Sequence, residues 1–297
     1  MNPYAQALYG AWEKDFTLVQ WDQRGAGRTF GRNHGLEGPA AQRWTEDDFA
    51  APGQLTIEGM AQDGIEVAQY LAARLGARKV ILFGGSWSSI LAVHMAKRRP
   101  DLFHAYVGTG QIVNCLDNEL ATYRKLLLLA RAAGDQKTVS ALEAMGAPPW
   151  ENPRNFGIMR RATRVYEAKK ATAPPKAWWT PAPLYATREM EADYTGGEDF
   201  SFIQFVGLKG NGMFSTVALE KLGLDFAIPV FLLQGAEDLV TVPEIARRYF
   251  DAIVAPQKAF ILLPAVGHDP NTAMVDAQFK VLVERVRPLV NGETPRP

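Results

Sequence analysis

The chain has 297 residues and carries equal numbers of basic and acidic side chains, 32 of each, so its net charge is about zero. This balance leaves no global basic field, and we expect no nucleic-acid partner. The single cysteine, Cys115, excludes an internal disulfide. No stretch approaches the roughly 20 apolar residues of a membrane span, and no signal peptide is visible, so we expect a cytoplasmic protein without a membrane partner.

The first third of the chain alternates between strand-like and helical patterns. Apolar residues recur at helical spacing and are separated by β-prone runs and glycine-containing turns. Strands that alternate with helices indicate a parallel sheet with right-handed crossovers. The predicted order is a helix at 4–14, a strand at 16–21, a tight glycine loop at 22–29, a polar and irregular stretch at 30–54, a helix at 57–75, a strand at 79–83, a helix at 88–98 and a strand at 104–108.

The alternation stops after about residue 112 and returns near residue 226. Prolines and tryptophans are concentrated between these points, and residues 115–133 have the apolar spacing of a helix. The tryptophans either form the core of a small cap or line a substrate pocket. We therefore predict a core, residues 1–112 and 226–297, and an inserted, mostly helical cap, residues 113–225.

The last part of the chain returns to strands and helices. The uninterrupted apolar run at 229–234 is typical of a strand buried on both faces. A capping-box pattern at 241–244 opens a helix, a second apolar run at 259–263 is the last strand, and a helix at 272–288 closes the chain. The predicted fold class is α/β, with a mostly parallel sheet and helices on both of its faces.

The strand at 79–83 leads into two glycines and then Ser86, which stands before a helix-forming run. Strand, sharp turn, serine and helix form the construction called a nucleophile elbow. Because the turn strains the serine backbone, the residues two positions away must be small, as Gly84 and Ser88 are. The usual pattern has a glycine where this chain has Ser88. Ser86 is therefore a candidate nucleophile, and a serine in an ordinary strand-to-helix turn is the alternative.

Two further polar residues follow predicted strands, Asp238 after the strand at 229–234 and His268 after the strand at 259–263. The carboxyl ends of parallel strands share one edge, so we expect Ser86, Asp238 and His268 to meet there. A serine hydroxyl needs a base to remove its proton, and histidine titrates near neutrality. A carboxylate can hold the histidine tautomer and stabilise the imidazolium.

Other residues of the same types fit these roles less well. Glu237 and Asp269 compete with Asp238 for the role of the acid. The chain has three other histidines. We expect His34 in a polar loop, His94 on a helix face turned away from the elbow, and His104 at the start of a strand.

Two segments resemble the prolyl aminopeptidase (proline iminopeptidase) group of α/β-hydrolases. Residues 22–29, DQRGAGRT, are similar to the D-Q-R-G-x-G-R-S segment of that group, and residues 84–89, GGSWSS, to its G-G-S-W-G-S elbow. The order serine, acid, histidine along the chain is also that of the α/β-hydrolase fold. The resemblance implies this fold, a Ser86–His268–Asp238 triad and hydrolysis through an acyl-enzyme.

The resemblance covers about 16–112 and 226–290 and is specific to the core. The tryptophan-plus-glutamate motif with which that group grips a free amino terminus is not found in the cap, where Tyr166-Glu167 is a poor substitute. The candidate substrate-binding residues are therefore aromatic or acidic residues of the cap: Trp178, Trp179 and Glu189.

The His-Gly-Gly-Pro-Gly loop of that group is also not found. In this fold one N–H of the oxyanion hole comes from the residue after the nucleophile, here Trp87, and the other comes from that early loop. The resemblance further implies a strand between those at 16–21 and 79–83, so here either the sheet has a gap or these two strands pair directly. We hypothesise that the chain is truncated at its N-terminus.

Three functions remain open at this point. The first is a serine hydrolase that cleaves N-terminal, proline-type residues from peptides or small amides, and the second is a carboxylic-ester hydrolase with the same triad. The third is an inactive fragment or a non-catalytic binding protein, because the oxyanion loop is missing. In each case the expected partner is a small molecule or a short peptide. The sequence has no phosphate-binding loop, no Cys/His ligand set and no calcium loop, so we expect no cofactor and no metal.

Overall fold

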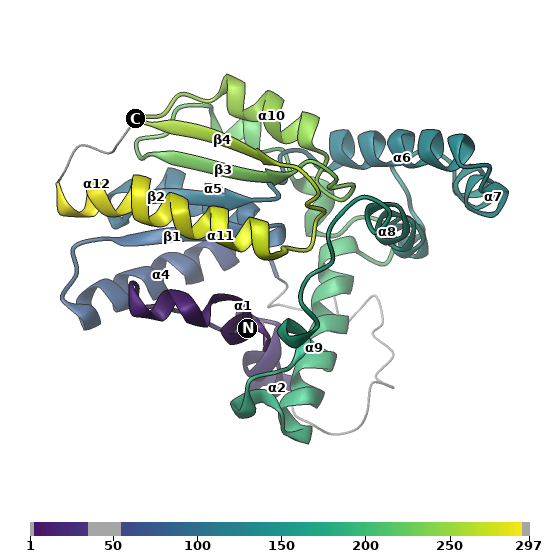
Figure 1. Cartoon of the computed structure of the whole chain (residues 1–297). Coiled ribbons are helices and arrows are strands. Elements are labelled where there is room, and N and C mark those ends of the chain that lie inside the picture. The colour runs from purple at the N-terminus through teal and green to yellow at the C-terminus, as the bar shows by residue number, and fades with distance from the viewer. Residues whose placement is uncertain (1–2, 35–54, 293–297) are drawn as a thin grey trace.

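A computed structural model of the chain describes residues 3–34 and 55–292. Its centre is a parallel sheet of four strands in the order β1-β2-β3-β4 (Figure 1). The predicted parallel sheet and the α/β class are confirmed. The strands are β1 (Val80–Gly85), β2 (Phe103–Thr109), β3 (Val230–Gly235) and β4 (Lys258–Leu263).

Helices cover both faces of the sheet (Figure 1). Successive side chains of a strand point to opposite faces, so Tyr106 and Leu232 lie in one apolar cluster, and Val107 and Phe231 in the other. Every residue of β3 is buried, as its uninterrupted apolar run predicts. The first face carries α4 (Ile57–Leu75), α5 (Trp87–Arg98) and α10 (Pro243–Ala252), and the second carries α1 (Ala5–Tyr9) with the 3₁₀ turn Gly10–Lys14, α11 (Thr272–Val281) and α12 (Arg287–Asn291).

The described chain between β2 and β3 is helical. Three of its helices, α6, α7 and α8, lie beyond the end of the sheet, and α9 packs against α2 (Gly27–His34) (Figure 1). The division into a core and a cap stays a prediction. The helices are α6 (Cys115–Ala132), α7 (Gln136–Met145), α8 (Pro153–Glu167) and α9 (Arg188–Val206), with short 3₁₀ turns at Lys176–Trp179, Pro183–Tyr185, Met213–Thr216 and Leu219–Leu222.

The prediction of a strand at 16–21 is wrong. A strand needs a neighbouring backbone to complete its hydrogen-bond ladder, and β1, at the edge of the described sheet, pairs with β2. Direct pairing of 16–21 with β1 is therefore also wrong. Phe16 and Leu18 instead pack against the apolar cluster under α11, so the β-prone residues of this segment serve packing and not a ladder.

The glycine loop at 22–29 is shorter than predicted, because α2 begins at Gly27. The Asp22 carboxylate accepts a hydrogen bond from the Arg28 N–H at 3.2 Å and so satisfies a donor of the first helical turn. Residues 30–34 were expected to be irregular and are helical. The remainder of that polar stretch, 35–54, lies outside the described residues.

Candidate active site

Ser86 occupies a one-residue turn between β1 and α5. Its φ of +50° and ψ of −121° lie outside the regions that L-residues favour, as the elbow interpretation predicts. A Cβ on Gly84 would come within 2.7 Å of the Ser88 carbonyl oxygen, so this position requires glycine. The Ser88 hydroxyl donates to the Gly85 carbonyl at 2.8 Å and accepts from the Gly85 N–H at 2.9 Å. Ser88 thus fits where the usual pattern has glycine.

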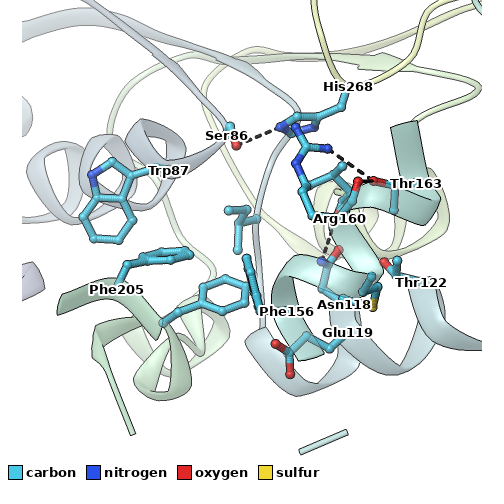
Figure 2. Close-up of a pocket in the computed structure, with 14 residues that line it drawn as sticks. Ser86, Trp87, Asn118, Glu119, Thr122, Phe156, Arg160, Thr163, Phe205 and His268 are labelled. Carbon is cyan, nitrogen blue, oxygen red and sulfur yellow. Dashed lines mark hydrogen bonds between the residues drawn. The ribbon is translucent and has the colours of Figure 1, made fainter. Parts of the chain in front are cut away.

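The structure brings together the three residues that the sequence pointed to. His268 Nε2 lies 2.9 Å from Ser86 Oγ (Figure 2). On the other side of the ring, His268 Nδ1 lies 3.0 Å from Asp238 Oδ2. The histidine comes from the loop after β4 and the aspartate from the loop after β3. In this arrangement a histidine can take a proton from the serine hydroxyl while the carboxylate stabilises the imidazolium that forms.

Asp238 is buried and fully hydrogen-bonded. Its Oδ1 accepts the Val240 and Thr241 N–H groups at 2.8 and 2.7 Å, and its Oδ2 accepts the Thr241 hydroxyl at 2.6 Å and the Gln234 amide at 3.0 Å. Burial by itself raises the pKa of Asp238, but the charge and hydrogen bond of His268 and the hydrogen bonds from Thr241 leave that pKa below its ordinary value. The carboxyl is therefore ionised at neutral pH.

Asp238 in turn raises the pKa of His268. Burial lowers the pKa of His268, but the charge of Asp238 and its hydrogen bond to the ring outweigh burial, and the pKa lies above its ordinary value of 6.5.

The two acids that compete with Asp238 in the sequence pair with basic side chains. Glu237 lies 3.9 Å from the Lys170 ammonium, and Asp269 lies 3.9 Å from the Arg160 guanidinium. Among the other histidines, His94 lies in α5, His104 in β2 and His34 at the end of α2.

Sequence reasoning missed a second buried carboxylate beside this site. Glu167, the last residue of α8, is 7% exposed. Its Oε1 accepts the Leu239 N–H at 2.7 Å, and its Oε2 accepts the His268 N–H at 3.3 Å. Burial, followed by the charge of Asp238, raises the pKa of Glu167. The only signal in the sequence is the Tyr166-Glu167 pair, a poor substitute for the amino-terminus motif.

A pocket of about 200 Å³ opens beside Ser86 and His268. Trp87 and three phenylalanines form an aromatic part of its wall, in which Phe205 meets the Trp87 ring edge-on at 5.1 Å and the Phe214 ring at 4.6 Å between centroids. Figure 2 shows Trp87 and Phe205 on the side of the pocket opposite Arg160. Two charged side chains line it, Glu119 from α6 and Arg160 from α8. Glu119 is 8% exposed, and burial raises its pKa to about 7.

The residues that the sequence suggested for substrate binding do not line this pocket. Trp178 packs on the apolar cluster of the sheet that contains Trp12, so it forms no core of a cap either. Trp179 is 52% exposed and contacts the Tyr4 ring edge-on at 5.8 Å. Glu189 is exposed in the first turn of α9. Apart from Trp87, the pocket aromatics are phenylalanines from α8, α9 and the following 3₁₀ turn, which only the packing of these helices brings to Ser86.

Trp87, the predicted donor to an oxyanion, is the first residue of α5. The N–H groups of a first helical turn have no acceptor within the helix and carry the positive end of its dipole. The Trp87 indole donates to the Gln23 side chain at 3.2 Å, which ties the elbow to the segment at 22–29. The oxyanion role of Trp87 stays a prediction.

The sequence matches the alpha/beta hydrolase fold family over residues 4–271, and the chain therefore belongs to that family. It is 28% identical over 270 residues to a protein of Bacillus subtilis named probable aminopeptidase YbaC, over 87% of this chain and 76% of the relative. The protein is thus an enzyme of the α/β-hydrolase superfamily that resembles prolyl aminopeptidases.

Two solved structures share the fold at low sequence identity. The proline iminopeptidase of Mycobacterium smegmatis is similar with a TM-score of 0.62 and 16% identity, over 98% of this chain and 86% of that one. A thermophilic esterase from Thermogutta terrifontis is similar with a TM-score of 0.53 and 15% identity, over 96% and 85% of the two chains. At these identities the similarities show the fold alone.

Neither a membrane segment nor a metal cluster is visible among the described residues. No helix there combines the length and the apolar character that crossing a bilayer requires. The same residues hold no group of three or more His, Cys, Asp or Glu side chains arranged to bind a metal ion.

Proposed function

We propose that the protein is a serine hydrolase in which Ser86 is the nucleophile, His268 the base and Asp238 the acid. One observation carries the proposal: a hydrogen-bond chain of 2.9 and 3.0 Å ends at a serine with a φ of +50° that lines a pocket. Strained backbone is characteristic of catalytic nucleophiles at strand-to-helix turns.

The proposed reaction has two halves. Ser86 Oγ attacks the substrate carbonyl carbon while His268 Nε2 takes the hydroxyl proton, and the developing oxyanion faces the Trp87 N–H. His268 then gives the proton to the departing amine or alcohol, which leaves an acyl group on Ser86. Water then attacks the acyl carbon while His268 removes one of its protons. The bond to Ser86 Oγ breaks, the proton returns from His268 to Ser86, and the acyl group departs as a carboxylic acid.

We further propose that the substrate is a short peptide or small amide, cleaved after an N-terminal residue of proline type. The relative named an aminopeptidase and the proline iminopeptidase fold support this choice. A pocket of about 200 Å³ suits one small acyl residue, and in this proposal the carboxylate of Glu119, one of the lining residues, pairs with the free ammonium group. An ammonium beside Glu119 would lower the pKa of this carboxyl from about 7.

An ester hydrolase with the same residues is the second candidate. The observation that favours it is the apolar wall of Phe156, Phe205 and Phe214, which would equally accept a hydrocarbon acyl chain. The fold similarity to an esterase is compatible with this choice.

Three substrates separate the candidates: a proline arylamide, the same arylamide with its amine acetylated, and a short acyl ester. An aminopeptidase cleaves the first and not the second, whereas an ester-only profile contradicts the aminopeptidase. A fluorophosphonate probe should label the wild type at Ser86, and S86A should lose both labelling and turnover. A folded wild type that is not labelled would overturn the serine-hydrolase proposal in favour of a non-catalytic binding protein.

A further inference from the structure

Glu167 joins the two loops that carry the acid and the base. Leu239, whose N–H binds Oε1 at 2.7 Å, is the residue directly after Asp238. The other oxygen, Oε2, accepts from the N–H of His268 itself at 3.3 Å. Both oxygens act as acceptors, as those of an ionised carboxylate do. One buried side chain from α8 therefore spans the loop after β3 and the loop after β4.

The segment that follows Glu167 packs against the same histidine loop. The Thr172 N–H donates to the Ala265 carbonyl at 2.8 Å, and the Asn271 amide donates to the Thr172 carbonyl at 3.0 Å. Gly267 lets the loop approach closely, because a Cβ there would come within 3.1 Å of Glu167 Oε2. The chain just after α8 is thus hydrogen-bonded to the histidine loop both before and after His268.

We infer that Glu167 is a positioning residue, whose carboxylate holds the Asp238 and His268 loops at the separation that the hydrogen-bond chain to Ser86 requires. The inference rests on the proposed function for its catalytic consequence, and on the contacts of Glu167 for its geometry. A misplacement of about 1 Å in a catalytic group can cost on the order of 100-fold in rate, so a clamp between the two loops matters.

Glutamine cannot replace this carboxylate without loss. A Gln side chain offers one acceptor oxygen and one NH₂ group, so the amide would satisfy one backbone N–H and face the other with a donor. The change also removes a charge beside the imidazole. The charged groups that face His268 are Asp238, Arg160 and Glu167, of which the two carboxylates raise the pKa of His268 and the guanidinium lowers it.

The experiment compares E167Q with Y166F, a variant of the neighbouring buried residue. Tyr166 donates to the Asp135 carboxylate at 3.0 Å, so Y166F removes a hydrogen bond of the same helix end that does not involve either loop. For each protein we would measure Tm, kcat and KM on the best substrate of the three-substrate set, and the pKa of the His268 imidazole by NMR. The chain has four histidines, and H268N identifies the signal of His268.

In E167Q we expect kcat to fall about 10- to 100-fold with KM changed less than about threefold, since the displaced groups act on the reaction and not on substrate binding. The pKa of His268 should move down. In Y166F, kcat and the pKa of His268 should match the wild type even if Tm falls. If E167Q does not fold, G267A displaces the same carboxylate and should lower kcat in the same way.

Two results would overturn the inference. A folded E167Q with wild-type kcat and an unchanged pKa of His268 would show that Glu167 only fills space. An equal loss of kcat in Y166F would show general destabilisation of α8. Failure of the proposed function is distinguishable, because a wild type that is neither labelled nor active still reports the pKa of His268. In that case an unchanged pKa of His268 in E167Q would contradict the contact between Glu167 and the His268 loop, and a lowered pKa would support it.

Discussion

The edge of the sheet and the wall of the pocket are built in different ways. Just beyond three strand ends lie Ser86, Asp238 and His268. Backbone N–H groups and the Thr241 hydroxyl hold the Asp238 carboxylate in place by hydrogen bonds. Phe205 and Glu119 in the wall come from helices between β2 and β3, where side-chain packing sets their positions. Under the proposed function, changes at the edge should affect every substrate, and changes in the wall should affect the choice among substrates.

The largest effect is expected at the edge, in D238N. The amide introduced there would keep the shape of the side chain but lose the charge that stabilises imidazolium, so kcat should fall by about 10⁴-fold on arylamide and ester alike. Steady-state kinetics on both substrates, with Tm as the check on folding, measures this. A loss confined to one substrate would break the distinction between edge and wall.

The pH dependence sharpens the same point. His268 must be neutral to accept the Ser86 proton, and its pKa lies above 6.5 because Asp238 outweighs burial. We expect kcat/KM to rise with pH through a value above the ordinary histidine pKa and then to level off. In D238N the rise should move to lower pH, because burial remains and the carboxylate charge is gone. An uncharged ester keeps substrate ionisation out of the profile, and a D238N profile at the wild-type position would contradict the assignment.

The difference between the two regions also explains what the sequence could predict. Ser86, Asp238 and His268 were found because each follows a local apolar run, and because parallel strands bring their carboxyl ends to one edge. Their meeting needed no knowledge of how the helices pack. The strand at 16–21 failed for the complementary reason, since β-propensity cannot supply the partner that a ladder requires.

The wall was not predictable in the same way. Glu119 lies on α6 among residues that match an amphipathic helix, and only the packing of α6 places it in the lining of the pocket. Glu167 ends α8 with no local feature that marks its contacts with Leu239 and His268, which are 72 and 101 residues away. The place of Glu119 at the pocket and the contacts of Glu167 both depend on how distant segments pack, which periodicity does not encode.

An intermediate effect is expected in the wall, in E119Q. The variant should lower kcat/KM for the proline arylamide about 10- to 100-fold, the range of a lost charged hydrogen bond, and leave the ester within about twofold. For the arylamide, protonation of Glu119 below about pH 7 should add to the loss that protonation of His268 causes on every substrate, so the wild-type arylamide profile should fall more steeply than the ester profile. E143Q is the matched control, because Glu143 pairs with Arg131 on the surface of α7. Equal losses on both substrates would remove Glu119 from substrate selection.

The smallest effect is expected for W179A, which tests where the wall ends. Trp179 is 52% exposed and meets Tyr4 away from the pocket, so we expect kcat/KM within about twofold of the wild type and a stability change of about 0.5 kcal/mol. F205A is the informative comparison, since Phe205 packs between Trp87 and Phe214 in the pocket wall. Its loss should alter the ratio of arylamide to ester turnover, because an apolar wall contributes to the selection of the acyl group. If W179A instead changed that ratio as F205A does, substrates would reach beyond the pocket to the tryptophans, and the sequence-based assignment of Trp179 to substrate binding would be restored.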